Sequence, residues 1–328
     1  MRSLRAAAYP LRLVAARLGR WHAAVALVVL GLAAGAAVLL GGRAGALVAQ
    51  DRAVGQAVER IPDAYRSVRA VWFGLPGQSD EPYARLDERA RRALDAAGST
   101  RQTAVVFFRE TSVAGTFAGL GGVDGLGRWV TLRAGRLPEV CRPERCEVLR
   151  LRGDGRLPQP EGLRLVEVGE AVLERLVLFG DFLAPTDNAL AAAEVSPVVA
   201  RAAGYHRPPP APLFLAEGVD TLATAAPLRR IFRSHAWVAP LREGEPRLWE
   251  IDELAAGVVN ARSELQTASS SFDVLAPVEE LREAQATSRA AGRRLGIVGG
   301  EAAALLFAFA LLAAMTLRGD MAAARRRL

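Results

Sequence analysis

The sequence predicts a membrane-anchored α+β protein, in which two transmembrane helices flank a globular domain with a split β-α-β core and an inserted β-rich segment. Long hydrophobic runs stand near the two ends of the chain, at 21–41 and 295–317, and the segment between them is mostly polar. Within that segment, two strand–helix–strand patterns are separated by a long stretch of short strand-like runs.

Each hydrophobic run is long enough to cross a bilayer as a helix. The first contains His22 as its one polar side chain, and the second contains a single charge, Glu301. A helix rises 1.5 Å per residue, so about 20 residues match the roughly 30 Å hydrocarbon layer. The basic start also fits a cleavable signal peptide, but the run is long for a signal core. We therefore expect an uncleaved anchor.

Arginine placement predicts the orientation of both helices. Five arginines and no acidic residue precede the first run: Arg2, Arg5, Arg12, Arg17 and Arg20. Four arginines and one acidic residue follow the second: Arg318, Asp320, Arg325, Arg326 and Arg327. Short arginine-rich flanks stay in the cytoplasm. Residues 1–20 and 318–328 are thus expected to be cytoplasmic at the plasma membrane, with residues 43–294 extracytoplasmic.

Composition argues against several functional classes. The arginine-rich flanks account for the net charge of +7, so the segment between them is close to neutral and no nucleic-acid partner is expected. The chain contains no lysine, which excludes a phosphate-binding P-loop and Schiff-base chemistry. Because no acid/base pair or nucleophile constellation emerges either, we expect no catalytic site, no cofactor and no enzyme activity.

Two cysteines form the motif CRPERC, with Cys141 and Cys146 at its ends. An oxidising compartment favours a disulfide between them; free thiols or a metal half-site are the alternatives. The half-site would need two further ligands, and none is nearby. The three histidines do not stand at ligand spacing, so no metal is expected.

Helical stripes are expected beside both spans. A first helix should continue past its span to Pro62, with Leu47, Val54, Val58 and Ile61 on one face. A second helix should cover 277–294 and enter the second span. Its stripe recurs at steps of three and four: Val278, Leu281, Ala284, Ser288, Ala291, Leu295 and Val298. Through these stripes the two helices could pack against each other within one chain or against a second chain in a dimer.

Two β-α-β patterns lie in the segments 42–110 and 231–276. Strand, helix and strand are expected at 68–75, 82–97 and 103–108 in the first, and at 236–241, 251–265 and 272–275 in the second. Two such split units combine in a ferredoxin-like α+β layer.

Residues 111–230 would then be a β-rich insertion. Its strands are expected at 129–132, 147–151 and 163–168. The glycine-rich stretch 119–127 fails the dinucleotide-binding signature, because Asp124 or Val130 occupies the third glycine position. Turns and close backbone packing are expected there.

The layout and three segments resemble the N-terminal part of an FtsX/MacB-like ABC transporter permease in its actinobacterial form. The segments are GLGRWVTLRAGRLPEVCRPERCEVLRLRG (125–153), LFLAEGVDTL (213–222) and RRLGIVGGEAAALLFAFALLAAMTLRGDMAAARRRL (293–328). The resemblance implies a non-catalytic subunit that couples a separate cytoplasmic ATPase to the outer domain, and a homo- or heterodimer of permeases is an open possibility. The ATPase contact would lie in 318–328, at Arg318, Asp320, Arg325, Arg326 and Arg327.

Such permeases carry further spans after the second, whereas this sequence ends at residue 328. We expect a fragment of a longer permease; a naturally short relative is the alternative. Two other classes share the two-span layout: a membrane sensor with an extracytoplasmic ligand-binding domain, and a polysaccharide co-polymerase. Glu301 is expected to lie near the outer headgroups, with an intramembrane functional role as the alternative.

Overall fold

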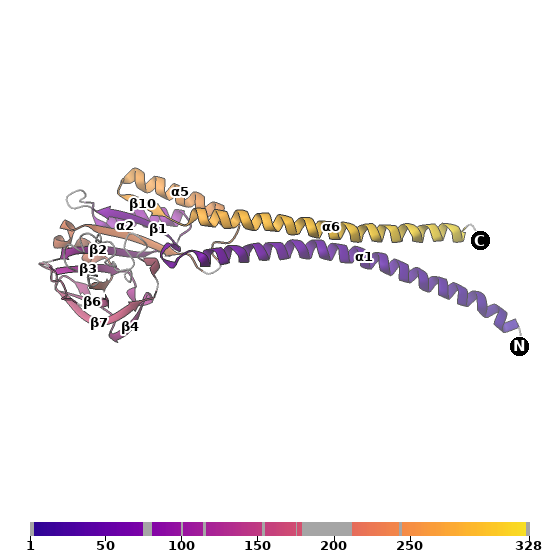
Figure 1. The fold of residues 1–328 in the computed structure, drawn as a ribbon, viewed down its shortest axis with the longest axis horizontal. Helices are drawn as coiled ribbons and strands as arrows, with labels where there is room; N and C mark the ends of the chain where they lie inside the picture. Colours follow the sequence, from indigo (N-terminus) through magenta and orange to yellow (C-terminus); the bar gives the residue numbers. More distant parts are fainter. Residues whose placement is uncertain are drawn as a thin grey trace, which may run out of the picture. The chain divides into compact units, whose positions relative to one another are not determined.

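The computed structural model describes residues 3–74, 81–99, 101–113, 116–152, 155–174, 176–178, 212–242 and 245–325 (Figure 1). It is a mixed α+β chain, in which a long apolar helix near each terminus flanks a β-sheet domain. Residues 54–283, which hold the sheet, form one compact unit, and residues 1–53 with 284–328 form a second.

The described strands form one ten-stranded sheet in the order β10-β1-β9-β2-β3-β8-β6-β7-β4, with β5 paired to β6. Their bounds are β1 Ser67–Gly74, β2 Thr103–Val113, β3 Thr116–Val123, β4 Val130–Gly135, β5 Cys141–Arg142, β6 Arg145–Arg152, β7 Leu165–Leu173, β8 Leu213–Glu217, β9 Arg233–Pro240 and β10 Phe272–Leu275. The helices of this domain are α2 Tyr83–Ala96, α4 Asp220–Thr224 and α5 Ile251–Ala268. Short 3-10 turns are η1 Asp63–Tyr65, η2 Leu126–Arg128, η3 Leu176–Leu178 and η4 Ala226–Arg230.

The elements of both expected β-α-β patterns are confirmed. β1, α2 and β2 form the first unit, and β9, α5 and β10 form the second. The strands of these two β-α-β patterns alternate in the sheet, because β9 pairs antiparallel with both β1 and β2, and β10 pairs antiparallel with β1. These four strands therefore stand in the order β10-β1-β9-β2 at one end of the sheet.

Helix α2 shows why the first unit folds as expected. Leu86, Ala90, Ala93 and Leu94 recur at helical spacing and are almost completely buried. The chain leaves the helix through Gly98 at φ +79°, a left-handed conformation that glycine adopts without steric cost.

Hydrophobic residues fill both faces of the sheet. One core joins the sheet to α2 and α5 and includes the fully buried rings of Trp72 and Trp237. A second core on the opposite face includes Phe107, Leu149 and Val177. A sheet buried on both sides explains the near-continuous apolar run of β2.

The strands of 111–230 extend the same sheet and share its cores. The boundaries expected at 111 and 230 thus divide two parts of one sheet. Pairing of β3 with β8 is parallel and joins residues far apart in sequence, for example Gly121 and Leu215. The expected strands at 129–132, 147–151 and 163–168 correspond to β4, β6 and β7, each shifted by a few residues.

Of the turns and close backbone packing expected at 119–127, the close packing is confirmed in the first half, where Gly119, Gly121 and Gly122 lie in strand β3 and not in a turn. A Cβ atom on Gly122 would stand 2.4 Å from the carbonyl oxygen of Gly218, so the glycine permits close packing of two backbones. A turn at Asp124 and Gly125, with Gly125 at φ +68°, leads into η2.

The terminal helices are α1 Ser3–Arg60 and α6 Val278–Arg325. Within them, Val28–Arg60 and Val278–Thr316 are long and apolar enough to cross a membrane. Where α1 and α6 enter the sheet domain, six residues form a small hydrophobic core: Val54, Val58, Ile61, Leu248, Ile251 and Leu281. Four members of the expected stripes are exposed, namely Leu47, Ala291, Leu295 and Val298.

Candidate functional site

Small residues bring α1 and α6 together in the unit of residues 1–53 and 284–328. A Cβ atom on Gly31 would stand 3.2 Å from Cβ of Ala310, and one on Gly35 would stand 3.2 Å from the ring of Phe307. Figure 1 shows α6 running beside the C-terminal half of α1. Small side chains allow such close approach of helix backbones, which is how membrane helices commonly pack.

The same contact continues at Gly292, where a Cβ atom would collide with the amide of Gln50. Further along α6 towards its N-terminus, Gln285 and Ser288 are each 4 % exposed. The face of α6 that meets α1 therefore combines small and polar residues. Buried polar groups in a helix pair restrict which registers satisfy their hydrogen bonds.

Helix α6 carries the expected coupling segment as a continuation of the helix. The helix extends without a break to Arg325, and Arg318 is exposed. Arg326 and Arg327 lie outside the described residues, and for Asp320 and Arg325 the structure describes the backbone alone. The segment thus projects at least one cation from a helix.

Glu301 is exposed and stands seven residues beyond Arg294, the expected membrane boundary. Seven residues of helix correspond to about 10 Å. Its near neighbour Ala303 is fully buried. Since successive residues are about 100° apart around a helix, Glu301 and Ala303 occupy opposite faces.

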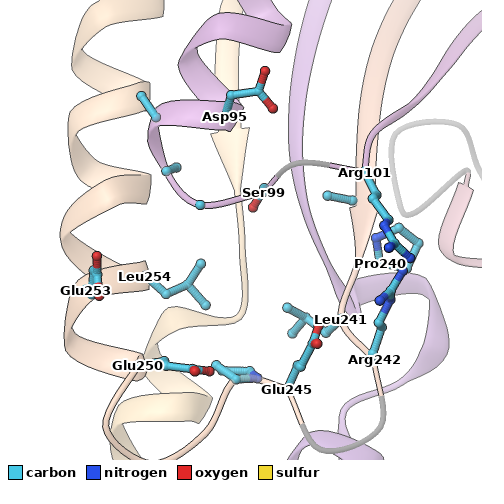
Figure 2. Close-up of a pocket in the computed structure, with 15 residues that line it drawn as sticks. Asp95, Ser99, Arg101, Pro240, Leu241, Arg242, Glu245, Glu250, Glu253 and Leu254 are labelled. Carbon is cyan, nitrogen blue, oxygen red and sulfur yellow. The ribbon is translucent and has the colours of Figure 1, made fainter.

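The sheet domain contains an open polar groove of about 710 Å³ (Figure 2). It lies between the C-terminal end of α2, the end of β9 and the start of α5. The charged residues that line it are Asp95, Arg101, Arg242, Glu245, Glu250 and Glu253. Figure 2 shows Arg101 and Arg242 on one side and Glu253 on the other. The groove offers charged hydrogen-bonding groups of both signs.

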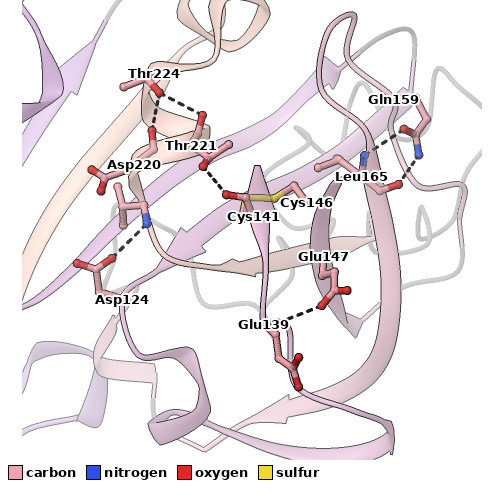
Figure 3. The surroundings of a disulfide bond; sticks show 11 residues. Asp124, Glu139, Cys141, Cys146, Glu147, Gln159, Leu165, Asp220, Thr221 and Thr224 are labelled. Atoms are coloured by element: carbon pink, nitrogen blue, oxygen red, sulfur yellow. Dashed lines mark hydrogen bonds between the residues drawn. A yellow bond between two sulfur atoms is a disulfide. The ribbon is translucent and has the colours of Figure 1, made fainter. Parts of the chain in front are cut away.

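Cys141 and Cys146 form a disulfide that joins β5 to the start of β6 (Figure 3). The Thr221 hydroxyl donates a hydrogen bond of 2.6 Å to the carbonyl oxygen of Cys141, which ties this turn to α4. Across residues 3–325, apart from the gaps given above, no group of three or more potential metal ligands occurs.

Beside the disulfide lies a buried carboxylate, that of Glu147, whose side chain is 2 % exposed. Arg136 donates to both of its oxygens at 2.6 and 2.8 Å, and the backbone N–H of Glu139 donates at 3.0 Å. Arg145 forms a further ion pair at 2.8 Å. Hydrogen bonds from Arg136 and Glu139 lower the pKa of Glu147 to about 2.

Sequence reasoning missed a buried aromatic cluster around His235. The rings of Trp72 and Tyr83 lie 5.4 and 5.1 Å from the imidazole. Burial, aided by the charge of Arg233, lowers the pKa of His235 to about 3, so the ring is neutral. Nearby, Asp87 accepts hydrogen bonds from Trp237 Nε1 at 2.7 Å and from the Tyr83 hydroxyl at 3.3 Å.

Side chains alternate between the two faces of a strand, so the sequence of β9 already indicated that His235 and Trp237 lie on the same face.

No protein-family model matches the chain, and no curated protein matches it.

Proposed function

We propose that this chain is a non-catalytic membrane subunit, of the FtsX/MacB-like permease kind, in an ABC transporter or mechanotransmission complex. In this proposal a partner ATPase on the cytoplasmic face moves the extracytoplasmic sheet domain through α1 and α6. The observation that carries the proposal is the combination of a split β-α-β sheet with an unbroken helix leading out of it at each end.

The strand order supports the porter-like part of the proposal. β10-β1-β9-β2 corresponds to the order 4-1-3-2 of a ferredoxin-like layer, with β3 to β8 inserted between its halves. Such a layer hosts many functions, so the fold alone gives a weak argument. Its placement between two apolar helices favours a membrane-tethered protein.

The helices support the membrane part. Both have a length and composition that suit a bilayer, and large apolar side chains such as Leu30, Leu305 and Phe309 are 63–70 % exposed. Lipid is the solvent that such surfaces fit. The arginines of both flanks favour cytoplasmic termini and an extracytoplasmic domain at 43–294.

The coupling role rests on the C-terminal end of α6. A rigid helix can transmit displacement along its axis, and α6 is continuous from Val278 to Arg325. The basic residues at its end would contact an acidic groove of the ATPase. The absence of lysine from the chain agrees with a separate nucleotide-binding partner, because a P-loop needs lysine.

Charge reversal in the full chain tests the coupling role. Arg325, Arg326 and Arg327 are changed together to Glu, and a matched variant changes the same three residues to Lys. The Glu variant should lose co-purification of the ATPase and stimulation of its activity, whereas the Lys variant should keep both. If the Glu variant inserts correctly and still recruits and stimulates the ATPase, these arginines act only as topological anchors.

A further inference from the structure

We propose that the polar groove at the C-terminal end of α2 binds a short peptide with free termini, whose carboxylate meets Arg101 and Arg242 and whose ammonium group meets Glu253. All residues that line this groove belong to the compact unit of residues 54–283. The inference therefore concerns the sheet domain alone, and it depends neither on the coupling to an ATPase nor on the membrane spans.

The size of the groove suits a peptide of a few residues. A Cβ atom on Gly257 of α5 would stand 2.8 Å from Cα of Ala97, so α5 and the end of α2 are in backbone contact beside the groove. The space that remains open is about 710 Å³. Sites for drug-sized ligands span about 300–1,000 Å³. A tripeptide is a molecule of that size, whereas a single amino acid would leave most of the groove to water.

Arg101 and Arg242 form the positive side of the groove. Arg101 precedes β2 and Arg242 follows β9, and these two strands pair antiparallel, so their ends bring both arginines to the same side (Figure 2). Both side chains are exposed, and within the described residues neither guanidinium forms an ion pair or hydrogen bond. Two arginines without a carboxylate partner favour an anion, and a carboxylate accepts paired hydrogen bonds from a guanidinium.

Glu253, in the first turn of α5, forms the opposite side of the groove (Figure 2). Its carboxylate, like that of Glu245, has no partner in the part of the chain that the structure describes. Glu250 already accepts a hydrogen bond of 2.9 Å from the backbone N–H of Arg247. Glu253 is thus the acidic side chain of α5 that is left to receive a cation in the groove.

The two signs stay apart in this groove, which distinguishes it from other charged parts of the sheet domain. Arg89 pairs with Glu81 at 3.0 Å, and Arg150 pairs with Glu167 at 2.6 Å. In the groove, arginines and glutamates line one cavity without pairing with each other. A molecule that carries a carboxylate at one end and an ammonium group at the other can contact both sides at once.

Apolar side chains lie between the two charged sides. Figure 2 shows Leu241 and Leu254 between Arg242 and Glu253, and both leucines pack against the main hydrophobic core. The hydroxyl of Ser99 is directed into the groove (Figure 2). A peptide fits this combination, because its side chains can cover the leucines and its amide groups can bond to the hydroxyl. Apolar surface with a few polar groups is typical of ligand sites.

Calorimetric titration of the detergent-solubilised full chain with the tripeptide Ala-Leu-Ala tests the assignment. The peptide with both termini free should bind. Acetylation of its N-terminus and amidation of its C-terminus should each raise Kd about tenfold, because each removes one charge-assisted contact. Free leucine carries the same terminal charges in a smaller molecule and should bind more weakly than the tripeptide.

Variants with matched controls locate the binding site. Arg101→Gln combined with Arg242→Gln should raise Kd about tenfold and remove the difference between the free and the amidated peptide. Arg85→Gln, at an exposed arginine of α2 outside the groove, should leave Kd unchanged. Glu253→Gln should remove the difference between the free and the acetylated peptide, whereas Glu264→Gln on the same helix should not.

The peptide site is wrong if the free tripeptide shows no saturable binding, if the blocked peptides bind as tightly as the free one, or if the groove variants keep the Kd of the parent chain. Leucine that binds as tightly as the tripeptide would overturn a peptide as the ligand class. Each of these outcomes leaves the proposed membrane and coupling roles untouched, since the titration involves neither an ATPase nor a bilayer.

Discussion

The ring of Phe307 in α6 lies against the backbone of Gly35 in α1, where a Cβ atom would stand only 3.2 Å from Cζ of the ring. Contacts this short between α1 and α6 leave no room for a larger side chain. The contact between α1 and α6 therefore depends on shape complementarity, in which small residues of one helix leave room for larger side chains of the other.

Replacement of Gly35 should loosen this pair. Gly35→Leu adds four carbon atoms where the Phe307 ring already lies, and overpacking of this kind typically costs about 1–3 kcal/mol. Thermal unfolding of the detergent-solubilised full chain should show a lower Tm. Gly41→Leu is the control, because nothing lies within 4 Å of its Cβ position, and an equal loss in both variants would show that the contact at Phe307 does not matter.

Glu147 should make the sheet domain sensitive to acid. Its pKa is lowered to about 2 from 4.5, so its stabilising contribution is present above pH 4.5 and is lost as pH falls towards 2. Glu147→Gln should lower the free energy of unfolding by about 1.5–3 kcal/mol at pH 7, the range for hydrogen bonds to charged groups.

Urea titrations of the full chain between pH 2 and 7 measure the effect. The profile of Glu147→Gln should be flatter than that of the parent chain below pH 4.5, and Glu139→Gln should resemble the parent, since its backbone N–H makes the contact. Parallel profiles for the parent and Glu147→Gln would refute the ion-pair account.

His235 should add a second, separate pH dependence. Its pKa is lowered to about 3 from 6.5, so the unfolded chain binds a proton that the folded chain rejects. Stability from this residue is present above pH 6.5 and falls as pH decreases towards 3. In His235→Phe, which keeps an aromatic ring beside Trp72 and Tyr83, the slope between pH 6.5 and 4.5 should decrease. An unchanged slope would mean that the imidazole is protonated in the folded chain.

Removal of the disulfide should destabilise the sheet domain modestly. Cys141→Ser with Cys146→Ser opens a loop of six residues, for which loop-closure entropy predicts about 2 kcal/mol. Chemical unfolding of the double variant measures the change. In the parent chain, alkylation without reductant should modify neither cysteine, and quantitative alkylation would show that the bond does not form in the mature protein.

The strands and helices of the two β-α-β units could be predicted because local pattern and tertiary environment agree. The 103–108 run is β-rich and buried, and the Leu86/Ala90/Leu94 spacing marks one side of a helix. In both cases, the residue types within a short stretch of sequence are enough to indicate the strand or the helix.

The contact face of α6 could not be read in the same way. The expected stripe ended in Leu295 and Val298, which are exposed, whereas Gln285 is buried and Gly292 lies against Gln50 of α1. In a water-soluble protein, hydrophobic side chains mark the interior. In a membrane helix, large apolar side chains can face lipid, whereas small side chains are enriched where two helices contact each other. Pairing of β3 with β8 was equally hidden, because parallel pairing across a long insertion leaves no local signal.

The account depends most directly on the side of the membrane that holds the sheet domain. An impermeant maleimide is applied to intact cells that carry one cysteine each, Gln266→Cys in α5 or Leu4→Cys, with Cys141 and Cys146 replaced by Ser. Gln266 is exposed in the sheet domain, so Gln266→Cys should react in intact cells, and Leu4→Cys should react only after permeabilisation. Labelling of Leu4→Cys but not Gln266→Cys in intact cells would contradict the account.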